Sequence, residues 1–288
     1  MQLIIQLLIT GVAMGFIYAL VGIEYTLIWN STGLLNFSHD KFILFGAYMF
    51  AGTYVLGLGL PPLLAILCMI LTMFLFGIVS AMAIFNPLSK LSSNLFAVIG
   101  TVILGRIITE AIRLIWGPLP FTLDTFLRGS VHIGNIVVSK SHIVIIVVCS
   151  IITAGLQIFF KTTKMGKAMR CVSENKTAAS LMGINVPLNI AFTVGLSAVI
   201  CATIGILVIP IFNVELQMSS MIGLKGFAAG VIGGFGYLPG AILGGILLGV
   251  VEIFGSMIIP SVYKDCLSFV LLIIFLLIRP SGILGHKK

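Results

Sequence analysis

A short polar segment between two long apolar runs is the part of this sequence with the clearest chemical potential. Polar groups are costly at membrane depth and are tolerated where they face a cavity or meet a partner. The segment is therefore a candidate wall of a solute pathway, and the alternative is an ordinary interfacial loop. Its residues are Asn36, Phe37, Ser38, His39, Asp40 and Lys41.

Two carboxylates also lie inside apolar runs, and an intramembrane acid is by default a functional hypothesis. Glu24 belongs to the first run, and its best nearby opposite charge is Lys41. We expect these two residues to pair inside the bundle; the alternative is a pair near the lipid headgroups. Glu252 has no opposite charge close to it in sequence, which makes it a further candidate pathway residue.

A third charged group lies in a later apolar run. Arg106 and Glu110 are four residues apart, so they can bond along one helix face and lower the cost of both charges, and Arg113 continues that side. The group is close to the predicted outer end of its span. This position favours snorkelling and structural pairing over ligand binding.

A basic segment between residues 161 and 176 has a different character. Its pattern predicts two short amphipathic helices, with Ser173 or Asn175 capping the second and Gly183 ending it in the left-handed conformation. A plain connection needs fewer residues, so the segment indicates a docking surface; the alternative is a solvated loop of the positively charged cytoplasmic side. Its basic residues are Lys161, Lys164, Lys167, Arg170 and Lys176.

The composition requires that all these residues be positioned by membrane-embedded elements. Of the 288 residues, 59% are hydrophobic and 8% are charged, which is too little polar surface for a water-soluble globule. Apolar runs near the roughly 20 residues of a helical span exclude the alternating pattern of a barrel. The basic residues lie mainly in loops, so the net charge of +8 does not indicate nucleic-acid binding.

We therefore predict an all-α fold, a polytopic transmembrane helical bundle of about eight to ten spans with broken or re-entrant segments, forming one domain over residues 1–288. Orientation follows from loop charge, which places residues 161–176 and the tail with Arg279, Lys287 and Lys288 in the cytoplasm. Residues 117–141 then lie outside, where a small hairpin or cap is expected. The predicted helical segments are Leu3–Trp29, Phe42–Leu58, Pro62–Phe85, Leu95–Trp116, His142–Phe160, Pro187–Ile211, Ile222–Phe235, Ala241–Ile259 and Cys266–Ile278.

Glycines recur at four-residue spacing near the C-terminal end, and this spacing puts each row on one helix face. Small faces let helix backbones approach closely in lipid. The rows predict close internal packing, and the alternative is a surface for a dimer or a pathway. They are Gly226, Gly230 and Gly234, then Gly240 and Gly244, then Gly245 and Gly249.

Motifs of catalysis are absent from the sequence. No glycine loop ending in Gly-Lys-Ser/Thr, no Gly-x-Ser-x-Gly, no His-Glu-x-x-His and no cysteine–histidine metal spacing occurs. The chain is therefore not expected to be an enzyme or to bind a metal. Any drive by ATP must come from another subunit.

Several motifs along nearly the whole chain are similar to the motifs of one protein family. The sequence resembles the permeases of the branched-chain amino acid (Liv-type) ABC transporters. The motifs are Gly15–Leu20 followed by Gly33–His39, Lys164–Arg170 with Ala178–Asn185, Gly223–Gly234, Pro239–Glu252, Tyr263–Asp265 and Arg279–Gly285.

The resemblance implies a multi-pass subunit of the bacterial inner membrane that pairs with a second, related permease, two ATPase subunits and an external solute-binding protein. It implies that ATP and Mg are used by the ATPases and that this chain binds no cofactor. Residues 161–186 become the element that couples ATPase closure to the helices. Within it the resemblance selects Lys164, Gly166, Lys167, Arg170, Glu174, Ala178, Ala179, Leu181 and Gly183.

Leucine, isoleucine and valine are the solutes that the resemblance favours, and urea, short amides and small aromatic acids are the alternatives. A gradient-driven secondary transporter is the alternative from another class. The chain departs from the family where Glu24 replaces a usual glycine and where Asp40 and Lys41 replace Gly-Glu. Both changes alter charge in the predicted pathway.

Overall fold

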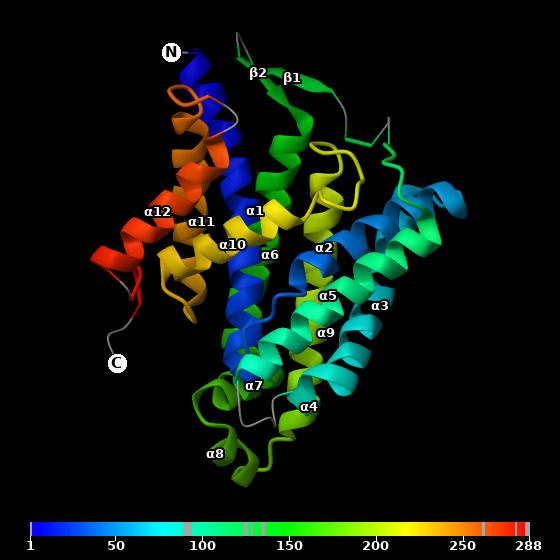
Figure 1. The fold of residues 1–288 in the computed structure, drawn as a ribbon, viewed down its shortest axis with the longest axis vertical. Coiled ribbons are helices and arrows are strands. Elements are labelled where there is room, and N and C mark those ends of the chain that lie inside the picture. The colour runs from blue at the N-terminus through cyan, green and yellow to red at the C-terminus, as the bar shows by residue number, and fades with distance from the viewer. Residues whose placement is uncertain are drawn as a thin grey trace. The chain divides into compact units, whose positions relative to one another are not determined.

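The computed structural model describes residues 2–88, 94–123, 126–127, 129–133, 136–260, 263–279 and 281–285. Pro280, Lys287 and Lys288, which belong to the predicted motif and cytoplasmic tail, lie outside the described residues. Within the described part, most residues lie in helices (Figure 1).

Every predicted helical segment is helical over most of its length, and the all-α prediction is confirmed. Six helices are long and apolar enough to cross a membrane within the described ranges, and α10 is a shorter apolar helix. The helices are α1 (Gln2–Thr32), α2 (His39–Tyr48), the π-helix η1 (Met49–Gly57), α3 (Pro62–Ser80), the π-helix η2 (Ala81–Phe85), α4 (Asn86–Leu88), α5 (Asn94–Trp116), α6 (Lys140–Thr162), α7 (Lys164–Glu174), α8 (Lys176–Leu181), α9 (Val186–Val208), α10 (Ser220–Gly233), α11 (Leu238–Gly255) and α12 (Lys264–Ile278).

The predicted hairpin precedes α6. Strands β1 (Ser130–Ile133) and β2 (Ile136–Ser139) pair antiparallel, with Ser130 opposite Ser139 and Val131 opposite Val138. The side-chain amide of Gln6 in α1 donates to the carbonyl of Val137 at 3.2 Å. The hairpin is thus attached to the N-terminal helix.

Contacts divide the chain into two compact units that alternate along the sequence. The first unit holds Met1–Thr26, Leu123–Thr153 and Ser220–Lys288, and the second holds Leu27–Thr122 and Ala154–Ser219. Both α1 and α6 therefore contribute to both units. The single domain predicted over residues 1–288 stays a prediction.

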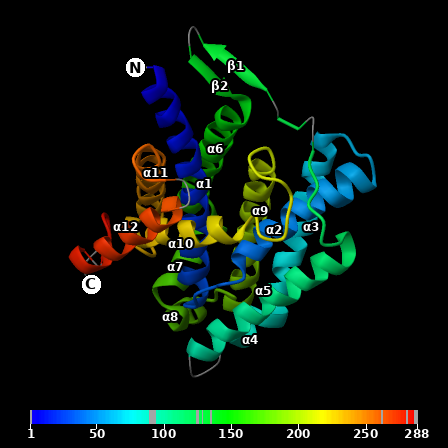
Figure 2. The same ribbon diagram turned by 45° about the horizontal axis from the view of Figure 1, so that its top comes forward.

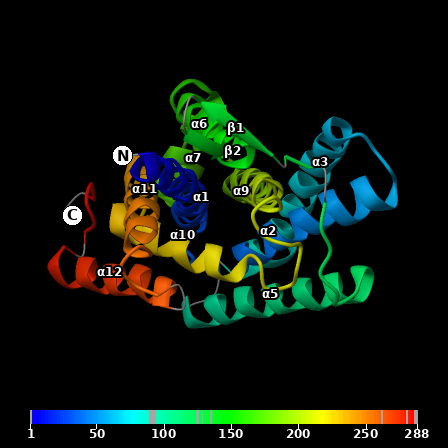
Figure 3. The same ribbon diagram turned by 90° about the horizontal axis from the view of Figure 1, so that it is seen from above.

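Glycine-to-backbone contact holds the first unit together. Helices α1 and α11 lie side by side in Figures 1 and 3, and a Cβ on Gly249 would lie 2.5 Å from the Cα of Gly15. A Cβ on Gly244 would lie 2.7 Å from the backbone N of Gly233 in α10. These rows serve close internal packing, as predicted, because any side chain there would separate the helices.

In the second unit, close contacts at glycines likewise occur around α9, most of whose side chains are buried. Helices α2 and α3 lie beside α9 (Figure 2). A Cβ on Gly46 of α2 would lie 2.5 Å from the Cβ of Ala202, and one on Gly77 of α3 would lie 2.7 Å from the Cα of Gly195. Helix α9 is therefore the core element against which α2 and α3 pack.

Candidate functional site

The polar segment is a tight turn between α1 and α2. Gly33 directly after α1 has φ +74°, a conformation that glycine adopts without strain. The side-chain oxygen of Asn36 accepts from the backbone N–H of Ser38 at 2.9 Å and from its hydroxyl at 2.6 Å, and His39 Nδ1 lies 3.1 Å from the Asn36 carbonyl. All three residues are buried, and these contacts between their polar groups stabilise the turn.

Helix α5 supports this turn from the side. The N–H of Phe37 donates to Thr101 Oγ1 at 3.2 Å, and a Cβ on Gly105 would lie 3.3 Å from Lys41 Cγ. Lys41 Nζ lies 2.8 Å from Asp40 Oδ2, and the two side chains are 16% and 15% exposed. The structure therefore places the six predicted residues in one turn. The Asp40–Lys41 pair at the end of this turn is partly exposed.

Glu24 belongs to the first unit. Its side chain is fully buried in α1. Lys41 lies in the second unit, where it pairs with Asp40. The Glu24–Lys41 pair stays a prediction.

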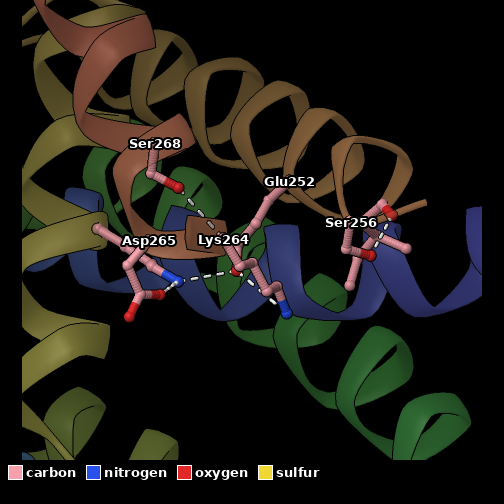
Figure 4. A network of polar contacts seen from close by, with 7 residues as sticks. Glu252, Ser256, Lys264, Asp265 and Ser268 are labelled. Carbon is pink, nitrogen blue, oxygen red and sulfur yellow. Dashed lines mark hydrogen bonds and ion pairs between the residues drawn. The ribbon is translucent and has the colours of Figure 1, made fainter. Parts of the chain in front are cut away.

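Glu252 is the centre of a buried charge network (Figure 4). Its Oε1 atom lies 2.8 Å from Lys225 Nζ and 3.2 Å from Lys264 Nζ, and Lys225 Nζ lies 2.6 Å from Asp265 Oδ1. The hydroxyl of Ser268 donates to Glu252 Oε2 at 3.4 Å. The network joins α10, α11 and α12, and the pathway role of Glu252 stays a prediction.

Sequence reasoning missed the partners of Glu252. Lys225 comes from a neighbouring helix, so sequence proximity gave no indication of it, although a lysine inside an apolar glycine-rich run is itself a signal for a buried partner. Lys225 is 5% exposed. Its ammonium also lies 5.8 Å from the ring centre of Tyr18 in α1, within the range of a cation–π contact.

On α5, Glu110 forms an ion pair with Arg113 instead of with its predicted partner Arg106. Glu110 Oε2 lies 2.9 Å from Arg113 Nη2, and both side chains are about half exposed, at 53% and 55%. Arg106, the partner predicted for Glu110, is exposed on the same helix.

The basic segment forms the two predicted short helices. Thr163 caps α7 by accepting from the N–H of Gly166 at 3.0 Å, and Asn175 caps α8 by accepting from the N–H of Ala178 at 3.0 Å. Gly183 has φ +82°. The predicted capping by Asn175 and the left-handed Gly183 are therefore confirmed.

The two helices present a charged face and an apolar tip to the surroundings. Gly166 and Ala179 are buried and position the helices, and a Cβ on Gly166 would lie 2.7 Å from the Cα of Phe160. Leu181 and Met182 at the end of α8 are both 83% exposed. The other predicted residues are exposed as well, namely Lys164, Lys167, Arg170, Glu174, Ala178 and Gly183.

Lys176 links these helices to the polar turn. Its ammonium donates to the carbonyl of Thr32, the last residue of α1, and it lies beside Gly33. Burial lowers the pKa of the Lys176 side chain below the usual lysine value. A lysine that binds a helix C-terminal carbonyl also matches the negative end of the helix dipole. Sequence reasoning counted Lys176 only as one of the loop's positive charges.

The described residues offer no obvious place for a metal. Within the described ranges, no three His, Cys, Asp or Glu side chains lie close enough to hold a metal ion. The site therefore consists of a buried polar turn, a charged pair at its end and an exposed helical segment connected to it through Lys176. Polar and charged residues held inside a bundle of apolar helices are typical of membrane transport proteins.

Comparison with known proteins gives the family. Residues 7–276 match the family described as "Branched-chain amino acid transport system / permease component", and the chain belongs to it. As a member with six apolar spans among its described residues, it is a multi-pass protein of the inner (plasma) membrane. No solved structure matches the chain significantly.

The related proteins cover nearly the whole chain. It is 33% identical to the high-affinity branched-chain amino acid transport system permease protein BraD of Pseudomonas aeruginosa, over 99% of this chain and 96% of BraD. It is 31% identical to the corresponding permease LivH of Escherichia coli, with the same coverage. A probable LivH of Methanocaldococcus jannaschii is 26% identical over 92% of this chain and 88% of its own length.

Proposed function

We propose that the chain is the membrane-spanning permease subunit of an ABC importer for leucine, isoleucine and valine. Family membership and the names of BraD and LivH support this solute class over urea, short amides and small aromatic acids. The chain itself is not an enzyme and binds no cofactor, and ATP and Mg are used by two separate ATPase subunits.

The observation that carries the proposal is the continuous connection within the second unit. The exposed tip of α8 lies on the same short helix as Lys176, and Lys176 contacts the end of α1, where the polar turn begins. A soluble subunit that pushes on α8 therefore acts directly on the turn. This is what alternating access driven by an ATPase requires: closure of the ATPases moves helices and exposes the pathway first outward and then inward.

The test is uptake by reconstituted vesicles. The chain is purified with the second permease and two ATPases encoded beside it, and uptake of labelled leucine is measured with the external binding protein present. We expect uptake that requires ATP on the ATPase side. Gradient-driven uptake by the chain alone would instead identify a secondary transporter.

A variant pair tests the docking surface in the same assay. Charges on the apolar tip, in Leu181→Asp with Met182→Asp, should remove ATP-driven uptake, because an aspartate pair cannot bury against an apolar pocket. Thr177→Asp adds a charge to the exposed side of α8 away from the tip and serves as the matched control. Equal loss in both variants would show that the tip has no special role.

A further inference from the structure

Helix α5 carries charges on a face that the rest of the chain leaves uncovered. One side of the helix is buried, with Ala97, Thr101 and Ile112 fully covered. The other side is exposed and mostly apolar, yet it includes Arg106 and Glu110. Because these residues recur every three to four positions, they form one stripe along the helix.

The depth of Arg106 along α5 disfavours lipid as its surroundings. It lies ten residues before Trp116 and twelve after Asn94, so about 15 Å or more of helix separates it from either end. This exceeds the length of an arginine side chain, so the snorkelling expected from the sequence does not bring the guanidinium to the headgroups. A charged side chain at the bilayer centre costs about 3 kcal/mol or more. This cost favours water or protein over lipid beside Arg106.

The charges around Arg106 leave it available for an anion. Glu110 pairs with Arg113, and Asp40 pairs with Lys41, which packs against the residue preceding Arg106. The ion pairs among the residues that the structure describes do not include Arg106. The two acids near Arg106, Glu110 and Asp40, are thus each paired with another cation, and Arg106 is the additional positive charge.

The apolar members of the stripe surround this cation. Val102 is 44% exposed, Ile103 is 53% exposed and Ile107 is 60% exposed. Positions three and four residues before Arg106 and the position after it lie within one helical turn of the guanidinium. One carboxylate group and one aliphatic side chain of a small solute can therefore contact the stripe together.

We propose that this face of α5 lines the solute pathway and that Arg106 binds the carboxylate of the travelling amino acid, while Val102, Ile103 and Ile107 contact its aliphatic side chain. The proposal rests on the proposed function, which supplies an amino acid as the solute. The planar guanidinium donates two parallel hydrogen bonds to a carboxylate, a geometry that lysine does not reproduce.

The first test measures access of water to position 106 in the assembled importer, independently of transport. Arg106→Cys is compared with Leu71→Cys, which lies in the middle of the uncharged helix α3 at a side chain 62% exposed. An anionic, membrane-impermeant methanethiosulfonate is the probe. Both variants are made in a chain whose native cysteines are replaced by alanine, namely Cys68, Cys149, Cys171, Cys201 and Cys266.

We expect the thiol of Arg106→Cys to react about tenfold faster or more than that of Leu71→Cys, because the thiolate is the reactive form and lipid disfavours it. Binding protein loaded with leucine, together with ATP, should slow the labelling of Arg106→Cys. Equal, slow labelling of both variants would overturn the proposal. So would a disulfide that joins the thiol of Arg106→Cys to a cysteine placed on the second permease, since the stripe would then be a subunit contact.

The second test is transport. Arg106→Met should lower the maximal rate of leucine uptake about tenfold or more, since it removes a hydrogen-bonded charge from the path of the solute. Lys140→Met, which removes an exposed cation at the start of α6, is the matched control. Normal uptake by Arg106→Met in an intact assembly would overturn the proposal, whereas absence of uptake by the wild type would refute the proposed function.

Discussion

The two buried charges Lys225 and Glu252 in the first unit lie against each other and against two less buried charges. Lys225 and Lys264 balance Glu252 and Asp265, and they come from α10, α11 and α12. An isolated charge in a low-dielectric interior is costly, and a paired charge costs far less. The network is thus stable only while all three helices keep their places.

Removal of one partner is therefore more harmful than removal of a pair. Glu252→Gln leaves the ammonium of Lys225 in place with weaker compensation, and we expect the free energy of unfolding to fall by about 3 kcal/mol. Denaturant or thermal unfolding in detergent measures the change. The double variant Lys225→Met with Glu252→Leu keeps the net charge and should recover much of the loss. A double variant as unstable as the single one would contradict this account.

Lys176 makes stability depend on pH. Burial lowers the pKa of its side chain, so at a pH between the lowered value and the usual one the unfolded chain binds more protons than the folded chain. Stability contributed at this site should therefore rise as pH increases toward about 10.5.

The measurement compares the wild type with Lys176→Met across alkaline pH. The difference in unfolding midpoint should change in favour of the wild type as pH rises. Lys167→Met, at an exposed lysine of the same segment, is the matched control. A difference that stays constant with pH would show that Lys176 titrates alike in the folded and unfolded chain.

At the level of single residues, the sequence predicted which residues are capping groups or buried charges, but it did not predict many of their ion-pair partners. Asn175 and Gly183 were predictable because capping and left-handed turns are local. The pairing of Glu252 with Lys225 was not, since it joins two helices 27 residues apart in sequence. Glu110 was assigned the wrong arginine because both Arg106 and Arg113 lie within one turn of it.

Several helices of this chain pack closely because glycines leave no side chain between their backbones. The row Gly245 and Gly249 on α11 meets α1 at Ala19 and Gly15, and Gly226 and Gly230 of α10 meet α1 further along. Without a hydrophobic drive between helices in lipid, close backbone contact supplies much of the packing energy. The four-residue spacing was visible in sequence, and the predicted helix bounds were good for the same reason: both signals repeat within one element.

A single methyl group is enough to test this packing. Gly249→Ala would place its Cβ 2.5 Å from the Cα of Gly15, and backbone atoms there cannot rotate away. We expect a loss of about 1–3 kcal/mol in unfolding free energy, as in overpacked cores. Gly155→Ala in α6 is the matched control, because its Cβ would meet nothing within 4 Å. Alanine there should be neutral or stabilise by up to about 1 kcal/mol through helix propensity. Similar effects at both positions would rule out close packing at Gly249.

At the scale of the whole molecule, the chain divides into two units that share α1 and α6, an arrangement that sequence periodicity could not indicate. Periodicity reports which side of a helix is apolar, whereas unit boundaries depend on contacts between distant segments. The exposed α5 stripe and the exposed tip of α8 both belong to the second unit. One surface is therefore suited to solute and the other to a soluble partner within the same unit.

The composition of the assembly follows from these uncovered surfaces. If α5 lines the pathway as proposed, the exposed side of Arg106 needs a second membrane subunit opposite it to close that pathway. We expect the purified importer to contain one copy of this chain, one related permease and two ATPases, because the family is described as one component of a transport system. Native mass spectrometry of the complex in detergent measures the stoichiometry directly. Two copies of this chain with no second permease would contradict the heterodimer while leaving the α5 pathway intact. A chain that stays monomeric in lipid vesicles and still transports leucine would contradict both.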